Sequence, residues 1–245
     1  MLDNLKRIYS PNFDIKKRKP KSIEFIILHY TGMKKEKDAL ERLTNQNSKV
    51  SCHYFITYSG EIINLVPDLY TSWHAGRSAW KKKKSLNSKS LGIEISNPGH
   101  TFKYANFKKK QIKSLFLLVS KLKKKYKIRN THILGHSDIA PDRKKDPGEK
   151  FPWKLMKKKN MSIWHDLNEV MLKSLRNQKC TKFELFKFFN NLKKIGYQAK
   201  SKIKAAKAFQ RRFRQEQISG KIDKECLLIS NSLIKLNKYL NFIKF

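Results

Sequence analysis

The sequence predicts an α/β fold, in which a mixed central β-sheet is flanked by helices and followed by a small C-terminal helical bundle. Three observations lead to this fold class. Short apolar runs alternate with helical patterns over the first 160 residues, which is typical of strands interleaved with helices. A long amphipathic segment lies at 108–127, and only helical patterns follow residue 160. We therefore expect two domains, at 1–160 and 161–245.

The expected elements before residue 70 begin with a polar, basic arm that ends at Pro20. An apolar run at 23–29 predicts a buried strand, and 35–47 has a helical pattern. Two β-rich runs flank Ser59-Gly60, which predicts a hairpin of strands at 52–58 and 61–66.

The middle of the chain begins with polar loop residues at 70–90. A short strand follows at 91–96 and is stopped by Asn97-Pro98-Gly99. The segment 108–127 predicts an amphipathic helix, and its apolar residues recur at helical spacing: Ile112, Leu115, Phe116, Val119 and Leu122. Residues 131–135 lead into a loop punctuated by proline and glycine.

The C-terminal region contains four helical patterns. The first covers 163–175, and the second opens with the capping box at Thr181 to Glu184 and closes at Gly196. The third places Ile203, Ala206, Phe209 and Phe213 on one face. A turn at 219–223 precedes the last helix, which Asp223 caps and which runs towards Leu240.

The composition is strongly basic, with a formal net charge of +37. Such a charge alone would indicate nucleic acid or an anionic surface as partner. The lysine clusters are spread along the chain, however, and no nucleic-acid motif accompanies them. We interpret the charge mainly as compositional drift, expect no nucleic-acid partner, and leave open that the charge helps to capture an acidic substrate.

The three cysteines are Cys52, Cys180 and Cys226, and their odd number and wide spacing predict small buried residues rather than disulfides or a zinc site. No transmembrane segment, signal peptide or N-terminal lipoprotein cysteine is evident. We expect a monomer that acts in the cytoplasm, with the cell envelope as the alternative.

The loop from Gly135 to Gly148 carries the residues with the clearest chemistry. It contains His136, Lys144 and Asp146, with Asp138 as a competing carboxylate, and His29 ends the apolar run upstream. Two histidines and one carboxylate would leave a tetrahedral zinc ion with one open position for water. Asp138 could instead support a ligand histidine or order the turn.

Five blocks in order resemble the zinc-dependent N-acetylmuramoyl-L-alanine amidases of type 2, with the AmiD/AmpD group most similar. They are His29-Tyr30-Thr31-Gly32, residues 51–56, Trp73-His74-Ala75-Gly76, residues 91–95, and the loop with His136 and Asp146. This resemblance covers roughly residues 5–155. It implies Zn²⁺ held by His29, His136 and Asp146.

The resemblance also implies a general base, Glu94, and an electrostatic stabiliser, Lys144. Glu94 lies in the apolar run 91–95, where a carboxylate is costly unless it is paired or functional. Lys144 could neutralise an oxyanion, although a solvated lysine is the simpler interpretation in so basic a chain.

The remaining site predictions concern a substrate groove. Trp73 could stack on a sugar, and His74 and Arg77 could supply polar contacts. We interpret His53 as structural, and the sequence indicates no role for His100, His132 or His165.

The predicted activity is hydrolysis of the amide bond between N-acetylmuramic acid, or its 1,6-anhydro form, and L-alanine in peptidoglycan or muropeptides. The alternative is non-catalytic peptidoglycan recognition on the same fold. The C-terminal helices also resemble peptidoglycan-binding modules, on the segments 205–213 and 219–223, and the alternative for them is a packing appendage.

Overall fold

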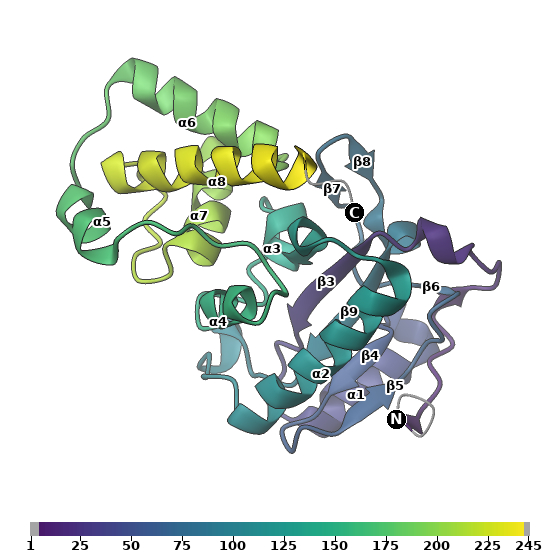
Figure 1. The fold of residues 1–245 in the computed structure, drawn as a ribbon. Helices are drawn as coiled ribbons and strands as arrows, with labels where there is room; N and C mark the ends of the chain where they lie inside the picture. The colour runs from purple at the N-terminus through teal and green to yellow at the C-terminus, as the bar shows by residue number, and fades with distance from the viewer. Residues whose placement is uncertain (1–4, 243–245) are drawn as a thin grey trace.

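The structure is a computed structural model that describes residues 5–242, with side chains described to residue 236. Its centre is a six-stranded sheet in the order β1-β5-β4-β9-β3-β10 (Figure 1). The strands are β1 (Lys6–Arg7), β5 (Ile62–Asn64), β4 (Tyr54–Ile56), β9 (Ser90–Ile95), β3 (Phe25–Tyr30) and β10 (Ile133–Gly135). Strands β4 and β5 form the predicted antiparallel hairpin, whereas β4, β9, β3 and β10 run parallel. The predicted mixed sheet is confirmed.

Helices cover both faces of this sheet (Figure 1). Phe55 of β4 packs in a small cluster with Ala39 and Leu43 of helix α1 (Glu36–Thr44). Its neighbours Tyr54 and Ile56 belong to the larger core, which holds the buried residues of helix α2 (Lys109–Tyr126). Because successive strand residues point to opposite faces, this alternation places α1 and α2 on opposite sides of the sheet.

Two small sheets were not expected from the sequence. Strand β2 (Phe13–Asp14) pairs with β6 (Thr71–Ser72), and β7 (Ala79–Trp80) pairs with β8 (Lys83–Lys84). The N-terminal arm is therefore built into the fold, and the segment 70–90 is not only loop. Strands of two residues are too short to show an alternating pattern, and the partner of β2 is far away in the sequence.

The C-terminal region is helical, as predicted. After α3 (His136–Ile139) and α4 (Trp153–Lys158), it forms α5 (Glu169–Leu175), α6 (Lys182–Ile195), α7 (Lys202–Phe213) and α8 (Lys224–Phe242). The capping box that opens α6 and its end at Gly196 are confirmed. Helix α5 begins later than the predicted start at 163, because the Asn168 side chain caps it by accepting from the next turn.

A buried arginine joins the helical region to the sheet. Arg212 of α7 pairs with the Asp138 carboxylate and donates to the Ile133 carbonyl at 3.1 Å. The hydroxyl of Tyr197 donates to the same carboxylate at 2.7 Å. Buried residues on both sides of residue 160 belong to one hydrophobic cluster, and the division into two domains stays a prediction. None of the described helices has the length and hydropathy needed to cross a membrane.

Candidate active site

The site lies at the carboxyl ends of three neighbouring parallel strands. In the β3–β9 pair His29 is aligned with Glu94, and in the β3–β10 pair Leu28 is aligned with Gly135. His136 directly follows Gly135, so it lies beside His29. Residues at adjacent register positions of parallel strands project from the same face, and the fold therefore places His136, His29 and Glu94 in one row.

Three ligand atoms converge in this row. The Nδ1 atom of His29 lies 2.9 Å from Nδ1 of His136 and 2.9 Å from Oδ2 of Asp146, and the last two atoms are 3.1 Å apart. All three side chains are buried, and they form the one group within the described residues that could hold a metal ion. Such closely spaced lone pairs are unfavourable without a proton or a cation between them. The donor set therefore fits a divalent metal, and two imidazoles with one carboxylate are the ligands that zinc prefers in catalytic sites.

The loop brings Asp146, and not Asp138, to this group. The amide of Ser137 donates to the Asp146 carbonyl at 2.8 Å, which holds the far end of the loop against α3. The Asp138 carboxylate instead accepts from the Gly135 amide at 2.8 Å and pairs with Arg212. Asp138 thus orders the turn and anchors α7, while Asp146 faces the histidines.

A chain of hydrogen bonds behind His29 assigns its tautomer. The hydroxyl of Ser90 donates to the Leu86 carbonyl at 2.6 Å, so its oxygen is left to accept from Nε2 of His74 at 3.1 Å. Nδ1 of His74 must then be an acceptor, and it receives the Nε2 proton of His29 at 3.0 Å. The lone pair of His29 Nδ1 is consequently directed at the ligand group.

His136 is held in the same way. Its Nε2 atom lies 3.1 Å from the carbonyl oxygen of Ala75, which can only accept a hydrogen bond. The proton therefore resides on Nε2, and Nδ1 is free to bind a metal. In both histidines the backbone of the 75–90 region determines which nitrogen is available, directly for His136 and through two side chains for His29.

Burial controls the charges of the ligands. Burial, together with the positive charge of His136, lowers the pKa of His29 to about 4, which favours the neutral ring that metals bind. Burial acts to raise the pKa of Asp146, but the charge and hydrogen bond of His136 and the hydrogen bond of His29 outweigh it and hold that pKa well below its usual range. The site thus favours a neutral His29 ring and an ionised Asp146 carboxylate.

Glu94 lies next to the ligand group without belonging to it. Its Oε1 atom is 4.0 Å from Nδ1 of His29, and its buried Oε2 atom has no hydrogen-bond partner among the described residues. Burial raises the pKa of Glu94 well above its usual value, and the Asp146 carboxylate raises it further, whereas Lys144 opposes both effects. A carboxyl group with a raised pKa beside a metal site is suited to take up and release a proton.

The ligand group opens into a pocket of about 450 Å³. Besides the predicted Trp73, His74, Glu94 and Lys144, its lining includes residues for which the sequence indicated no role, among them Tyr30, Thr31, His100 and Arg143. Arg143 donates to the carbonyls of Ala75 and Arg77 and so ties the histidine loop to the segment that carries His74. A guanidinium that spans two loops gives no local sequence signal.

The three predicted groove residues occupy different environments. The indole of Trp73 is fixed by its Nε1 proton, which is donated to Asp14 at 2.8 Å. His74 is buried behind His29, and burial, followed by the charge of His29, lowers its pKa well below the usual value. Arg77 is exposed and is not among the residues that line the pocket.

The other histidines lie outside the ligand group. His53 is fully buried, accepts from the Gly92 amide at 3.0 Å and contacts Ser72, which fits a structural role. His100 contacts Tyr30 and Glu149 at the edge of the pocket, and His132 stacks on Phe25. Of the three free cysteines, Cys52 and Cys226 are buried as expected, whereas Cys180 is only partly buried.

Comparison with known proteins identifies the family of this chain. The family model described as N-acetylmuramoyl-L-alanine amidase matches residues 19–149, a range that holds every residue of the ligand group together with Glu94 and Lys144. The N-acetylmuramoyl-L-alanine amidase AmiD of Escherichia coli K12 is 32% identical over 231 residues, which cover 87% of this chain and 83% of AmiD.

Two solved structures are similar over most of the chain. AmiD of E. coli, in complex with the substrate anhydro-N-acetylmuramic acid-L-Ala-D-gamma-Glu-L-Lys, superposes with a TM-score of 0.78 and 28% identity, covering 88% of this chain and 90% of AmiD. AmpDh3 of Pseudomonas aeruginosa, in complex with anhydromuramic pentapeptide, has a TM-score of 0.77 and 26% identity, covering 94% and 98%. Both similarities extend beyond the sheet into the C-terminal helices.

Proposed function

This chain belongs to the N-acetylmuramoyl-L-alanine amidase family, and we propose that it performs the family's reaction with a zinc ion held by His29, His136 and Asp146. The enzyme hydrolyses the amide bond between N-acetylmuramic acid, or its 1,6-anhydro form, and the L-alanine of the stem peptide. The observation that carries the zinc proposal is the convergence of two Nδ1 atoms and one carboxylate oxygen within about 3 Å of one another. A zinc ion bound there would lower the pKa of a water molecule and polarise the amide carbonyl.

The catalytic proton is assigned to Glu94. Its unpartnered Oε2 atom and its place beside the ligand group let it accept a proton from the attacking water and pass that proton to the leaving amine. The carboxyl must carry the proton between these two events, and its raised pKa favours the protonated form.

Lys144 is assigned to stabilise the oxyanion. It lines the same pocket, and its backbone amide donates to Ala140 at 3.0 Å, which holds the chain just before Asp146. An ammonium group at that position opposes negative charge on the carbonyl oxygen as it develops.

Substrate contacts are assigned to the pocket walls. With its N–H donated to Asp14, the Trp73 ring is held in one orientation and can stack on a sugar face. His74 would act through His29 and not by touching substrate, and Arg77 would reach only the outer part of a long substrate, because it lies outside the pocket lining. Peptidoglycan binding by the C-terminal helices remains a prediction.

The test is mass spectrometry of a defined anhydro-muropeptide after incubation with purified protein. We expect release of a stem peptide that begins with L-alanine, loss of this release on chelation, and its return on adding zinc. Glu94→Gln should abolish release while retaining the metal, because the ligand group is intact. Turnover in chelated protein would refute the metal assignment, and full turnover in Glu94→Gln would refute the assigned base. An intact muropeptide in zinc-loaded protein that still binds it would instead indicate recognition without catalysis.

A further inference from the structure

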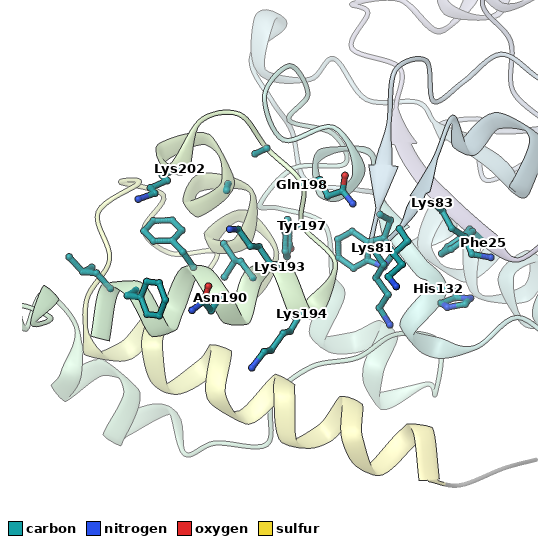
Figure 2. Close-up of a pocket in the computed structure, with 18 of the residues that line it drawn as sticks. Phe25, Lys81, Lys83, His132, Asn190, Lys193, Lys194, Tyr197, Gln198 and Lys202 are labelled. Atoms are coloured by element: carbon teal, nitrogen blue, oxygen red, sulfur yellow. The ribbon is translucent and has the colours of Figure 1, made fainter. Parts of the chain in front are cut away.

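A second and larger cleft lies away from the active site, between the β7–β8 hairpin and helix α6. It has a volume of about 1270 Å³, and Figure 2 shows the lysines of α6 on one side and those of the hairpin on the other. Phe25, at the start of β3, lines it, whereas His29 lies four residues further along the same strand, about 13 Å away. We call this feature the lysine cleft.

The hairpin and α6 are joined firmly at the base of the lysine cleft. The Lys81 amide donates to the carbonyl of Gly196 at 2.9 Å, and the Trp80 indole packs edge-on against Tyr197. A Cβ atom on Gly196, whose φ is +144°, would lie 2.4 Å from the Trp80 ring, so the glycine permits this close approach. The lysine cleft is therefore a built part of the fold.

The interior of the lysine cleft is aromatic and aliphatic. Its apolar lining residues come from both walls: Phe25, Trp80, Leu185, Phe186, Phe189, Leu192 and Tyr197. Phe186 is 65% exposed, and Phe183, one helical turn earlier on α6, is 73% exposed. Exposed phenylalanines beside lysines are typical of surfaces that enter the interfacial region of a membrane.

The rim carries positive charge and no carboxylate. Seven lysines line the lysine cleft: Lys81, Lys82, Lys83, Lys182, Lys193, Lys194 and Lys202. Among the side chains described, only Lys83 of these seven has an ion-pair partner, which is Glu24. Burial, and then the positive charge of Arg129, lower the pKa of Lys81. An anionic ligand between the two walls would supply the counter-charge that the other six lysines lack among the described side chains.

We propose that the lysine cleft binds an anionic phospholipid of a membrane surface, with the phosphate among the rim lysines and an acyl chain along the apolar lining. The volume exceeds the range of ordinary small-molecule sites, about 300–1,000 Å³, and suits an extended ligand. The combination of charged rim and apolar floor matches a molecule with one anionic end and one hydrocarbon end. A polyanion without hydrocarbon, such as an acidic peptide, would leave the floor uncovered.

Vesicle binding tests the proposal without using the amidase reaction. The full chain is sedimented with vesicles of phosphatidylcholine alone or mixed with phosphatidylglycerol. We expect Lys193→Gln/Lys194→Gln to weaken binding to the mixed vesicles roughly thirty-fold, since each lysine near an anionic surface contributes about fivefold. The matched control is Lys113→Gln/Lys124→Gln on α2, which removes the same charge from two exposed lysines that do not line the lysine cleft. Equal losses in both variants would show that only overall charge acts, and would overturn the proposal.

The apolar half of the proposal has its own readout. Vesicles with brominated acyl chains should quench the fluorescence of the wild type more than that of Trp80→Phe, because bromine acts only on nearby indoles. Phe186→Ser should reduce vesicle binding, whereas Leu117→Ser, at a similarly exposed position on α2, should not. Equal quenching of the wild type and Trp80→Phe would overturn the proposal. It would also be overturned if polyglutamate displaced the protein from the vesicles and Phe186→Ser had no effect on vesicle binding.

Discussion

The hydrogen-bond chain behind His29 predicts that His74, which does not itself bind the metal, controls metal affinity. Replacing His74 by phenylalanine keeps a ring of similar size but removes the acceptor for the Nε2 proton of His29, now 3.0 Å away. A buried donor left unsatisfied costs about 1–3 kcal/mol, and the ring can then shift its proton to Nδ1 and lose the metal-binding lone pair. Because 1.4 kcal/mol is a factor of ten, we expect metal affinity to fall roughly tenfold to hundredfold.

Two further variants act on the same chain from other positions. Ser90→Ala removes the acceptor that holds His74, and it should weaken the metal by a smaller factor because His29 keeps its partner. Gly92→Ala would place a Cβ atom 2.4 Å from the His74 ring and should displace that ring, with an effect close to that of His74→Phe. The control is Ser88→Ala, which changes an exposed serine two residues before Ser90.

The assay is competition for zinc between each protein and a fluorescent chelator at fixed pH, with circular dichroism to confirm folding. The expected order of zinc affinity is wild type and Ser88→Ala, then Ser90→Ala, then Gly92→Ala and His74→Phe. A folded His74→Phe protein whose zinc affinity stays within about twofold of wild type would refute the argument, because the second-layer hydrogen bond would then have no influence on the ligand.

Three other perturbations test separate parts of the structure. Lys144→Gln should lower kcat about a hundredfold with little change in zinc content, and an unchanged kcat in steady-state kinetics would exclude it as the oxyanion partner. Asp68 accepts from the Lys125 ammonium at 2.8 Å, and hydrogen bonds from Lys125 and two tyrosines hold its pKa below the usual value against the effect of burial. The ionised Asp68 carboxylate stabilises the fold above pH 4, about the pKa of an aspartate in the unfolded chain, and this stabilisation is lost as pH falls further. Asp68→Asn should therefore lower Tm at pH 7. A Tm difference between the variant and the wild type that persisted near pH 2 would contradict this assignment. Arg212→Leu leaves the buried Asp138 carboxylate without its partner and should cost about 3–5 kcal/mol in denaturant unfolding, whereas a loss below about 1 kcal/mol would show that the pair is not needed to hold α7.

Local sequence patterns predict much of the fold. The apolar run at 23–29 is strand β3, the amphipathic pattern at 108–127 is α2, and Thr181 with Gly196 delimits α6. These signals act within one element, through side-chain periodicity or a cap that satisfies nearby backbone groups, so sequence spacing is enough to detect them. The two-residue strands β2 and β6 have no such period, and they form only because the arm and the 70–90 segment meet in space.

For the site, too, the sequence identified the residues, and contacts with distant residues explain their arrangement. The ordered blocks around His29, Glu94, His136 and Asp146 identified the family and the class of reaction, which the comparisons confirm. The choice between Asp138 and Asp146 rested on resemblance, and the structure shows the physical basis of that choice: Asp138 is engaged by Arg212, 74 residues away. Cys180 was expected to be a buried residue like the other two cysteines, and the structure shows it only partly buried.

By itself, therefore, the sequence determined the order of the elements, the family and the set of residue types at the reaction centre. Only the tertiary structure decided which nitrogen of each histidine faces the ligand group, that His74 lies behind His29, and that lysines of the hairpin and α6 face each other across one cleft. The reason is physical. Periodicity and capping are set by neighbours along the chain, whereas tautomers, orphaned carboxylate oxygens and unpaired charges depend on groups brought together by packing of distant segments.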